Sequence, residues 1–147
     1  MTERSPKSTA ALDDAVARIV AIAALAGTAM VHVLQMPDAF GDAGYIGTLF
    51  VLVAVAGIAL AALMTQSTDD RLWMIAGALP AVVLIGYLLS RTSGLPGFSE
   101  GVGQWSNPLA LMAIVFESLL VCLSAVRLAP QHVHMTARSA PITRPTH

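Results

Sequence analysis

A single carboxyl lies in the middle of a long apolar stretch near the C-terminus. Glu117 stands about nine residues into the apolar run 108–126, at a depth where a carboxylate costs several kcal/mol unless it is protonated or paired. A carboxyl in that position can exchange a proton or bind a cation. It can also form a hydrogen bond between helices that fixes their packing. The sequence leaves both interpretations open.

Arg91 is the second charged residue in an unusual place, because it follows the apolar run 72–89 directly. Its guanidinium can reach the lipid headgroups while its alkyl stem stays in the hydrocarbon. Alternatively, it lies inside the top of the bundle beside an acidic group, for which the candidates are Asp38, Asp42, Glu100 and Glu117. At 1.5 Å per residue, Arg91 and Glu117 differ in depth by roughly 15 Å. A loop carboxylate or a bound anion is therefore the easier partner.

His32 lies near the end of the first apolar run, with Thr28 and Met36 four residues to either side. One helical face therefore presents a hydroxyl, an imidazole and a thioether. Imidazole and thioether donors suit copper, and Met112 or Glu117 would supply the further ligands. The simpler interpretation is an interfacial histidine with one hydrogen bond. Both a metal site at His32 and Met36 and a purely structural histidine remain hypotheses here.

The rest of the chain explains why these residues stand out. Its 147 residues are 56% hydrophobic and 12% charged, with a formal net charge of −1 and a mean hydropathy of +0.72. Soluble domains carry about 25% charged residues, so the composition is that of a membrane protein. The charge balance argues against a nucleic-acid partner, and one cysteine excludes an internal disulfide or a Cys-x-x-Cys motif. Because no nucleophile with a base and no metal-ligand spacing is assembled, we expect neither an enzyme nor a cofactor.

Four apolar runs must position the candidate residues. They cover residues 15–34, 45–64, 72–89 and 108–126. Each is close to the ~20 residues that a helix needs to cross about 30 Å of hydrocarbon. Asn107 and Pro108 are a typical N-cap and first position of a helix, Pro37 is expected to end the first helix, and Asp14 is expected to pair with Arg18. The predicted fold class is an all-α membrane protein, a bundle of four transmembrane helices.

The basic residues predict the orientation of the bundle. Seven of the eight Lys and Arg residues precede or open the first run, lie between the second and third runs, or follow the fourth, and Arg91 is the exception. The positive-inside rule therefore predicts a multi-pass protein of the cytoplasmic membrane with both termini in the cytoplasm. The predicted organisation is an N-terminal cytoplasmic tail over 1–14, a transmembrane domain over 15–127 and a disordered cytoplasmic tail over 128–147.

The connection 91–107 is the longest one between the runs and carries a candidate docking surface. Phe98, Val102 and Trp105 recur at three- to four-residue spacing, so we expect the connection to lie on the membrane surface or to cover the top of the bundle. The candidate docking residues are Thr92, Gly94, Pro96, Phe98 and Trp105.

Several short motifs occur together between residues 20 and 127. They are His32 with Pro37, Tyr45-x-Gly47-x-x-Phe50, Ser90-Arg91-Thr92-x-Gly94-x-Pro96, and Glu117. With these motifs the chain resembles a family of small four-helix integral membrane proteins found mainly in actinobacteria. The resemblance implies the fold and groups His32, Arg91 and Glu117 together, but it implies no activity. The chain differs from that family in the middle of the second run, where Val55, Ala56 and Gly57 replace a polar residue. A polar path at that point would be interrupted.

Two hypotheses of function follow. The first, which the sequence favours, is a non-catalytic accessory or interaction component that packs in the lipid bilayer through small residues, such as Gly57 and Ala61, against its own copies or a larger membrane complex. The alternative is a small transporter or an ion- or proton-handling protein that uses Glu117, His32 and Arg91. This alternative predicts a water-filled cavity that reaches Glu117 from the outer side.

Overall fold

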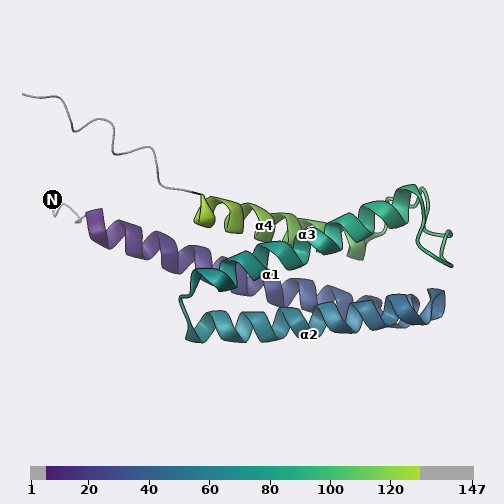
Figure 1. Cartoon of the computed structure of the whole chain (residues 1–147), viewed down its shortest axis with the longest axis horizontal. Coiled ribbons are helices and arrows are strands. Elements are labelled where there is room, and N and C mark those ends of the chain that lie inside the picture. The colour runs from purple at the N-terminus through teal and green to yellow at the C-terminus, as the bar shows by residue number, and fades with distance from the viewer. Residues whose placement is uncertain (1–5, 130–147) are drawn as a thin grey trace, which may run out of the picture.

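The computed structural model describes the backbone of residues 6–129 and the side chains of residues 12–129. Within this range the chain forms helices α1 (Pro6–Asp42), α2 (Gly44–Gln66), α3 (Asp70–Thr92) and α4 (Pro108–Leu128) (Figure 1). Each of the four helices in the described part is long and apolar enough to cross a membrane. The expectation of an all-α protein with four apolar spans is therefore confirmed. Residues 1–5 and 130–147 of the predicted tails lie outside the described residues.

The helices form two antiparallel hairpins that lie against each other. α1 packs along α2, α3 packs along α4, and the hairpins meet mainly where α1 contacts α4 (Figure 1). α2 and α3 are the least closely packed neighbours. We call the end with the start of α1, the α2–α3 connection and the end of α4 the terminus end. The opposite end, with the α1–α2 connection and residues 93–107, is the loop end.

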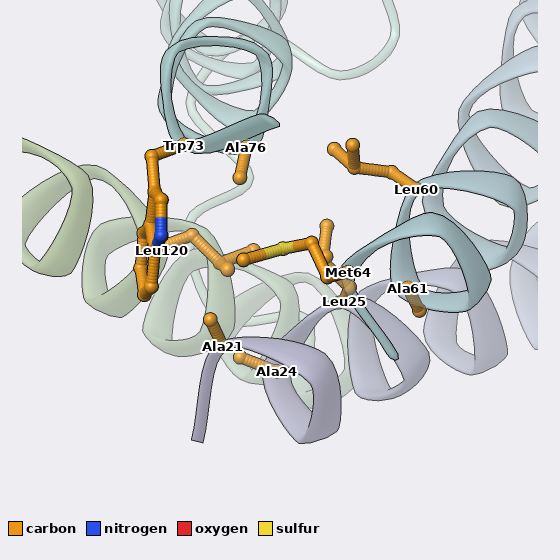
Figure 2. Close-up of a cluster of buried hydrophobic side chains, with 9 residues drawn as sticks. All are labelled: Ala21, Ala24, Leu25, Leu60, Ala61, Met64, Trp73, Ala76 and Leu120. Atoms are coloured by element: carbon orange, nitrogen blue, oxygen red, sulfur yellow. The ribbon is translucent and has the colours of Figure 1, made fainter. Parts of the chain in front are cut away.

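The hydrophobic core fills the half of the bundle toward the terminus end. Met64 extends from α2 toward Trp73 of α3 and Leu120 of α4, and all three side chains are at most 3% exposed (Figure 2). The complete cluster consists of Ala21, Ala24, Leu25, Leu60, Ala61, Met64, Trp73, Ala76 and Leu120. Because it draws on every helix of the described part, this cluster holds the two hairpins together.

Glycines let the helices approach closely in the same half. A Cβ added to Gly27 of α1 would lie 2.8 Å from the ring of Phe116 of α4. A Cβ added to Gly77 of α3 would lie 2.7 Å from the Cβ of Ser124 of α4. Real Cβ atoms do not approach other atoms so closely, so a larger residue at either position would force its neighbour on α4 to shift. The predicted close packing through small residues is therefore present where α4 meets α1 and α3.

Charged residues join the helices at the terminus end. Arg127 of α4 contacts Asp14 of α1, with 3.0 Å between Nε and Oδ1, and Asp70 of α3, with 3.3 Å between Nη2 and Oδ1. Arg18 donates a hydrogen bond to the backbone oxygen of Ser67, at 3.2 Å. The expected pair of Asp14 with Arg18 is wrong, because tertiary packing brings each residue a partner from another element.

The bounds of α1 also differ from those expected. α1 begins at Pro6 and so includes much of the predicted tail 1–14, and it continues through Pro37 to Asp42. Proline removes one helical hydrogen bond, but the turn after it is held by packing, since Ala39 is 3% exposed and Phe40 covers Gly47 of α2. Pro37 therefore does not end the helix.

The predicted start of the last helix is confirmed. The side chain of Asn107 accepts hydrogen bonds from the backbone N–H groups of Leu109 and Ala110, at 3.0 and 3.2 Å. Pro108 is the first residue of α4. The cap fixes the point where the connection 93–107 enters α4, and so the register that carries Glu117.

Candidate functional site

A cavity of about 420 Å³ opens at the loop end, between the two hairpins. Its mouth includes the exposed side chains of Asp38, Asp42 and Glu100. Its inner end is formed by His32 and Glu117, whose side chains are 3% and 1% exposed. The polar and charged lining residues are His32, Gln35, Asp38, Asp42, Tyr87, Ser90, Arg91, Glu100, Gln104, Asn107 and Glu117.

Apolar side chains form the walls between the mouth and the inner end. α2 supplies aliphatic residues and one aromatic ring, and α3 supplies two valines and Gly86. The wall residues from these two helices are Ile46, Leu49, Phe50, Val53, Val82, Val83 and Gly86. α1 and α4 also line the cavity, which borders the α2–α3 boundary, where the helices are least closely packed. A site of this size and lining is typical of sites for small molecules, which occupy about 300–1,000 Å³.

His32 and Glu117 form the polar inner end of the cavity. The His32 Nε2 atom lies 3.9 Å from Glu117 Oε1, which is too far for a hydrogen bond. The Nδ1 atom of His32 lies 2.9 Å from the backbone oxygen of Thr28, one helical turn earlier. A carbonyl oxygen only accepts hydrogen bonds, so Nδ1 carries a proton. In the neutral imidazole, Nε2 then has a free lone pair that faces the carboxyl group.

Two buried oxygens in this region lack a hydrogen-bond partner among the described residues. They are Glu117 Oε1 and Thr28 Oγ1. The His32 ring is held edge-on against Phe50, with 4.9 Å between ring centroids. Buried polar atoms without partners are costly and rare in folded proteins, so a carboxyl in this state, at the end of a cavity, is a candidate binding site.

Arg91 lies near the mouth, inside the top of the bundle. Its Nη1 donates a hydrogen bond to the backbone oxygen of Gly101, at 3.1 Å. Its guanidinium carbon lies 5.1 Å from the centre of the Tyr87 ring, an arrangement typical of a cation–π contact. No carboxylate lies within ion-pairing distance of Arg91 among the side chains of residues 12–129. The acidic partner of one of the two interpretations is therefore not observed among these side chains, and Arg91 contacts a loop carbonyl and an aromatic ring instead.

The connection 93–107 covers part of the cavity. Phe98 lines the cavity, and the Tyr45 hydroxyl of α2 donates a hydrogen bond to the backbone oxygen of Pro96, at 2.8 Å. Trp105 is 46% exposed and packs edge-on against Tyr87. Of the candidate docking residues, Thr92 and Pro96 are also exposed, whereas Gly94 and Phe98 are half-buried. The connection therefore covers part of the top of the bundle. This is one of the two arrangements predicted for it, the other being a position on the membrane surface.

The structure places one of the two residues of the hypothetical copper site in the cavity. His32 lines the cavity, whereas Met36 is absent from its lining. Among the described residues, no three His, Cys, Asp or Glu side chains lie close enough together to hold a metal ion. The arrangement of His32 with Glu117 fits a ligand other than a copper ion.

Sequence reasoning did not predict the contacts of two aromatic residues of the site. Phe50 holds the His32 ring, and Tyr87 lies under the Arg91 guanidinium. The spacing of Tyr87, four residues before Arg91 on one helix, was a usable signal, because such residues share a face. Phe50 gave no such signal, because its contact with His32 depends on how α2 packs along α1.

Comparisons with protein-family models, curated proteins and solved structures gave no match to this chain. The site therefore rests on its own geometry.

Proposed function

We propose that this protein is a small transporter, or an ion- or proton-handling protein, of the cytoplasmic membrane, with Glu117 as its proton or cation site. The observation that carries this proposal is the cavity that joins the exposed mouth at the loop end to the buried carboxyl of Glu117. Both termini are proposed to lie in the cytoplasm. This orientation would place the mouth of the cavity on the outer side of the membrane. The proposed role is non-catalytic.

The proposed working of the site follows from the cost of an unpaired charge. In a low-dielectric interior, a nearby cation stabilises the ionised form of a carboxyl group. Without such a cation, the neutral, protonated form is favoured. Arrival of a cation at Glu117 would therefore release a proton, and departure of the cation would take one up. His32 supports this exchange, because its Nε2 lone pair faces the same space and its ring is fixed by Thr28 and Phe50.

Reconstituted protein tests this proposal. Proteoliposomes with an entrapped pH dye receive a pH gradient, with valinomycin and potassium to prevent charge build-up, and the rate of proton movement is measured. We expect the wild-type protein to dissipate the gradient faster than protein-free liposomes, and Glu117→Gln to remove the increase. Asp70→Asn is the matched control, because it removes a carboxylate at the terminus end, far from the cavity. Equal rates for wild type, Glu117→Gln and empty liposomes would contradict the proposal.

The competing proposal is an accessory or interaction component that docks through the connection 93–107. It is supported by two exposed hydrophobic side chains, Val102 at 44% and Trp105 at 46%. Purification of the tagged protein in mild detergent distinguishes the two proposals. A larger membrane complex present in stoichiometric amount, and lost in Trp105→Ala, would favour the accessory role. A lone protein or a homo-oligomer would favour transport.

A further inference from the structure

The inner end of the cavity presents two hydrogen-bond acceptors to the same space. Neutral His32 has its lone pair on Nε2, because Nδ1 is engaged with the Thr28 carbonyl, and the ionised Glu117 has acceptors only. The two atoms are 3.9 Å apart, so neither satisfies the other. One donor atom placed between them can make a hydrogen bond of about 2.8 Å to each. The site therefore fits a group that carries at least two N–H donors.

The charges of the lining favour a cation. Among the described residues that line the cavity, Asp38, Asp42, Glu100 and Glu117 are acidic, and Arg91 is the single Lys or Arg residue. The three acidic residues at the mouth would raise the local concentration of cations. The Arg91 guanidinium contacts the Tyr87 ring and the Gly101 carbonyl. The partial negative charge of these two groups reduces the repulsion between Arg91 and a cation that enters the cavity.

The size and walls of the cavity favour an organic cation over a bare metal ion. A metal ion would use a small part of about 420 Å³, and the described residues include no cluster of three His, Cys, Asp or Glu side chains that could hold one. The apolar residues of α2 and α3 would instead contact a hydrophobic body, and the rings of Phe50, Tyr87 and Phe98 line the cavity. Aromatic faces attract ammonium groups. Leu49 and Val82 line the cavity but are also 51% and 67% exposed, so this wall lies at the outer surface of the bundle.

We infer that the cavity binds an organic ammonium ion with an apolar body, with its N–H groups between Glu117 and His32 and its body between α2 and α3. This inference rests on the proposed function and names the class of solute that the site would take. The group is a primary or secondary amine, because a quaternary ammonium has no N–H donor for the two acceptors.

A set of three naphthalene derivatives tests the inference. 1-Naphthylmethylamine carries a positive charge at neutral pH, 1-naphthylmethanol is its neutral analogue, and 1-naphthoate is negatively charged. Binding of each is measured by naphthalene fluorescence with the full chain in lipid nanodiscs, and empty nanodiscs correct for partition into lipid. We expect the amine to bind about tenfold or more tightly than the alcohol, since a hydrogen bond to a charged group contributes at least this much, and the carboxylate to bind least.

Two variants assign the binding to this cavity. Glu117→Gln keeps the size of the side chain and removes its charge, so amine affinity should fall to that of the alcohol, while alcohol binding is unchanged. Gly86→Leu should remove binding of both, because Gly86 lines the cavity and an added Cβ there meets no atom within 4 Å, so the larger side chain extends into the cavity without disturbing the fold. Gly44→Leu is the matched control, since Gly44 has the same free space and lies outside the lining.

The outcomes separate this inference from the proposed function. Equal binding of amine and alcohol, tighter binding of naphthoate, or unchanged amine binding in Gly86→Leu would overturn the inference. If the amine fails to bind but Glu117→Gln still slows proton movement in liposomes, the inferred class of ligand is contradicted and the proposed function is supported. If the amine binds with the expected selectivity but adding it to the liposomes moves protons no faster with the wild type than with Glu117→Gln, the binding site is supported and the transport proposal is contradicted.

Discussion

The two halves of this bundle are built from the same helices but are packed differently. Toward the terminus end, Leu25, Met64 and Leu120 are at most 1% exposed and pack against one another, and Arg127 joins α1, α3 and α4. Toward the loop end, the same helices enclose about 420 Å³ and leave a buried carboxyl oxygen of Glu117 without a partner. The difference indicates that one half supplies stability and the other supplies the site. Three pairs of variants and one single variant test this division.

The largest effect is expected from shortening a side chain of the closed half. Leu120→Ala should lower the free energy of unfolding by about 2–5 kcal/mol, because it leaves a hole among fully packed side chains. Ile114→Ala on the same helix should cost clearly less, since Ile114 is half-buried and already borders the cavity. Thermal and denaturant unfolding in the same detergent measures both. Equal losses would show that the two halves are packed equally well.

Enlarging a glycine should give the next largest effect, and again differ between the halves. Gly77→Leu on α3 meets Ser124 of α4, and such overpacking costs about 1–3 kcal/mol. Gly86→Leu lies on the same helix but meets nothing within 4 Å, so its stability should stay the same or rise by up to about 1 kcal/mol from better helix propensity. Unfolding curves of the two variants check the contrast, and a loss in Gly86→Leu similar to that in Gly77→Leu would argue against an open cavity there.

Removal of the charge at the terminus end should have a smaller effect. Arg127 and its partners Asp14 and Asp70 are 37%, 43% and 66% exposed, so Arg127→Gln should cost about 1 kcal/mol or less at low salt. The loss should shrink at high salt, because screening weakens the pairs in the wild type. Arg71→Gln, at the same end and without a carboxylate within ion-pairing distance among the described residues, is the control. A loss that is independent of salt would assign the effect to packing instead.

The smallest effect on stability should come from the hydrogen bond that crosses the mouth. Tyr45→Phe removes the exposed contact with the Pro96 carbonyl, which should cost about 0.5 kcal/mol, the lower end of the range for a hydrogen bond, and mainly loosen the connection. The backbone N–H groups of Leu95 and Phe98, which bond to each other's carbonyls at 2.8 Å, should then exchange with solvent faster, because local opening becomes easier. Exchange at Trp73 and Ala76 should be unchanged. Faster exchange in both regions would mean that the halves open together.

Several features of the fold were predictable because their causes are local. A run of about 20 apolar residues must form a helix in lipid, since the backbone has no other hydrogen-bond partners there. The start of α4 was equally clear, because Asn107 caps the helix within three residues of itself. The end of α1 was missed, since its last two turns are held by contacts of Ala39 and Phe40 that do not appear in the local sequence.

The sequence by itself determined the helices and the two residues, His32 and Glu117, whose presence in them needed an explanation. The tertiary structure alone decided that these residues, 85 positions apart, share one cavity, and that Arg91 faces Tyr87 and a loop carbonyl instead of a carboxylate. The physical reason is that a helix's hydrogen bonds are fixed along the chain, whereas its rotation against its neighbours depends on close contacts such as that of Gly27 with Phe116. Those contacts choose which buried polar groups meet, and hence what the cavity can bind.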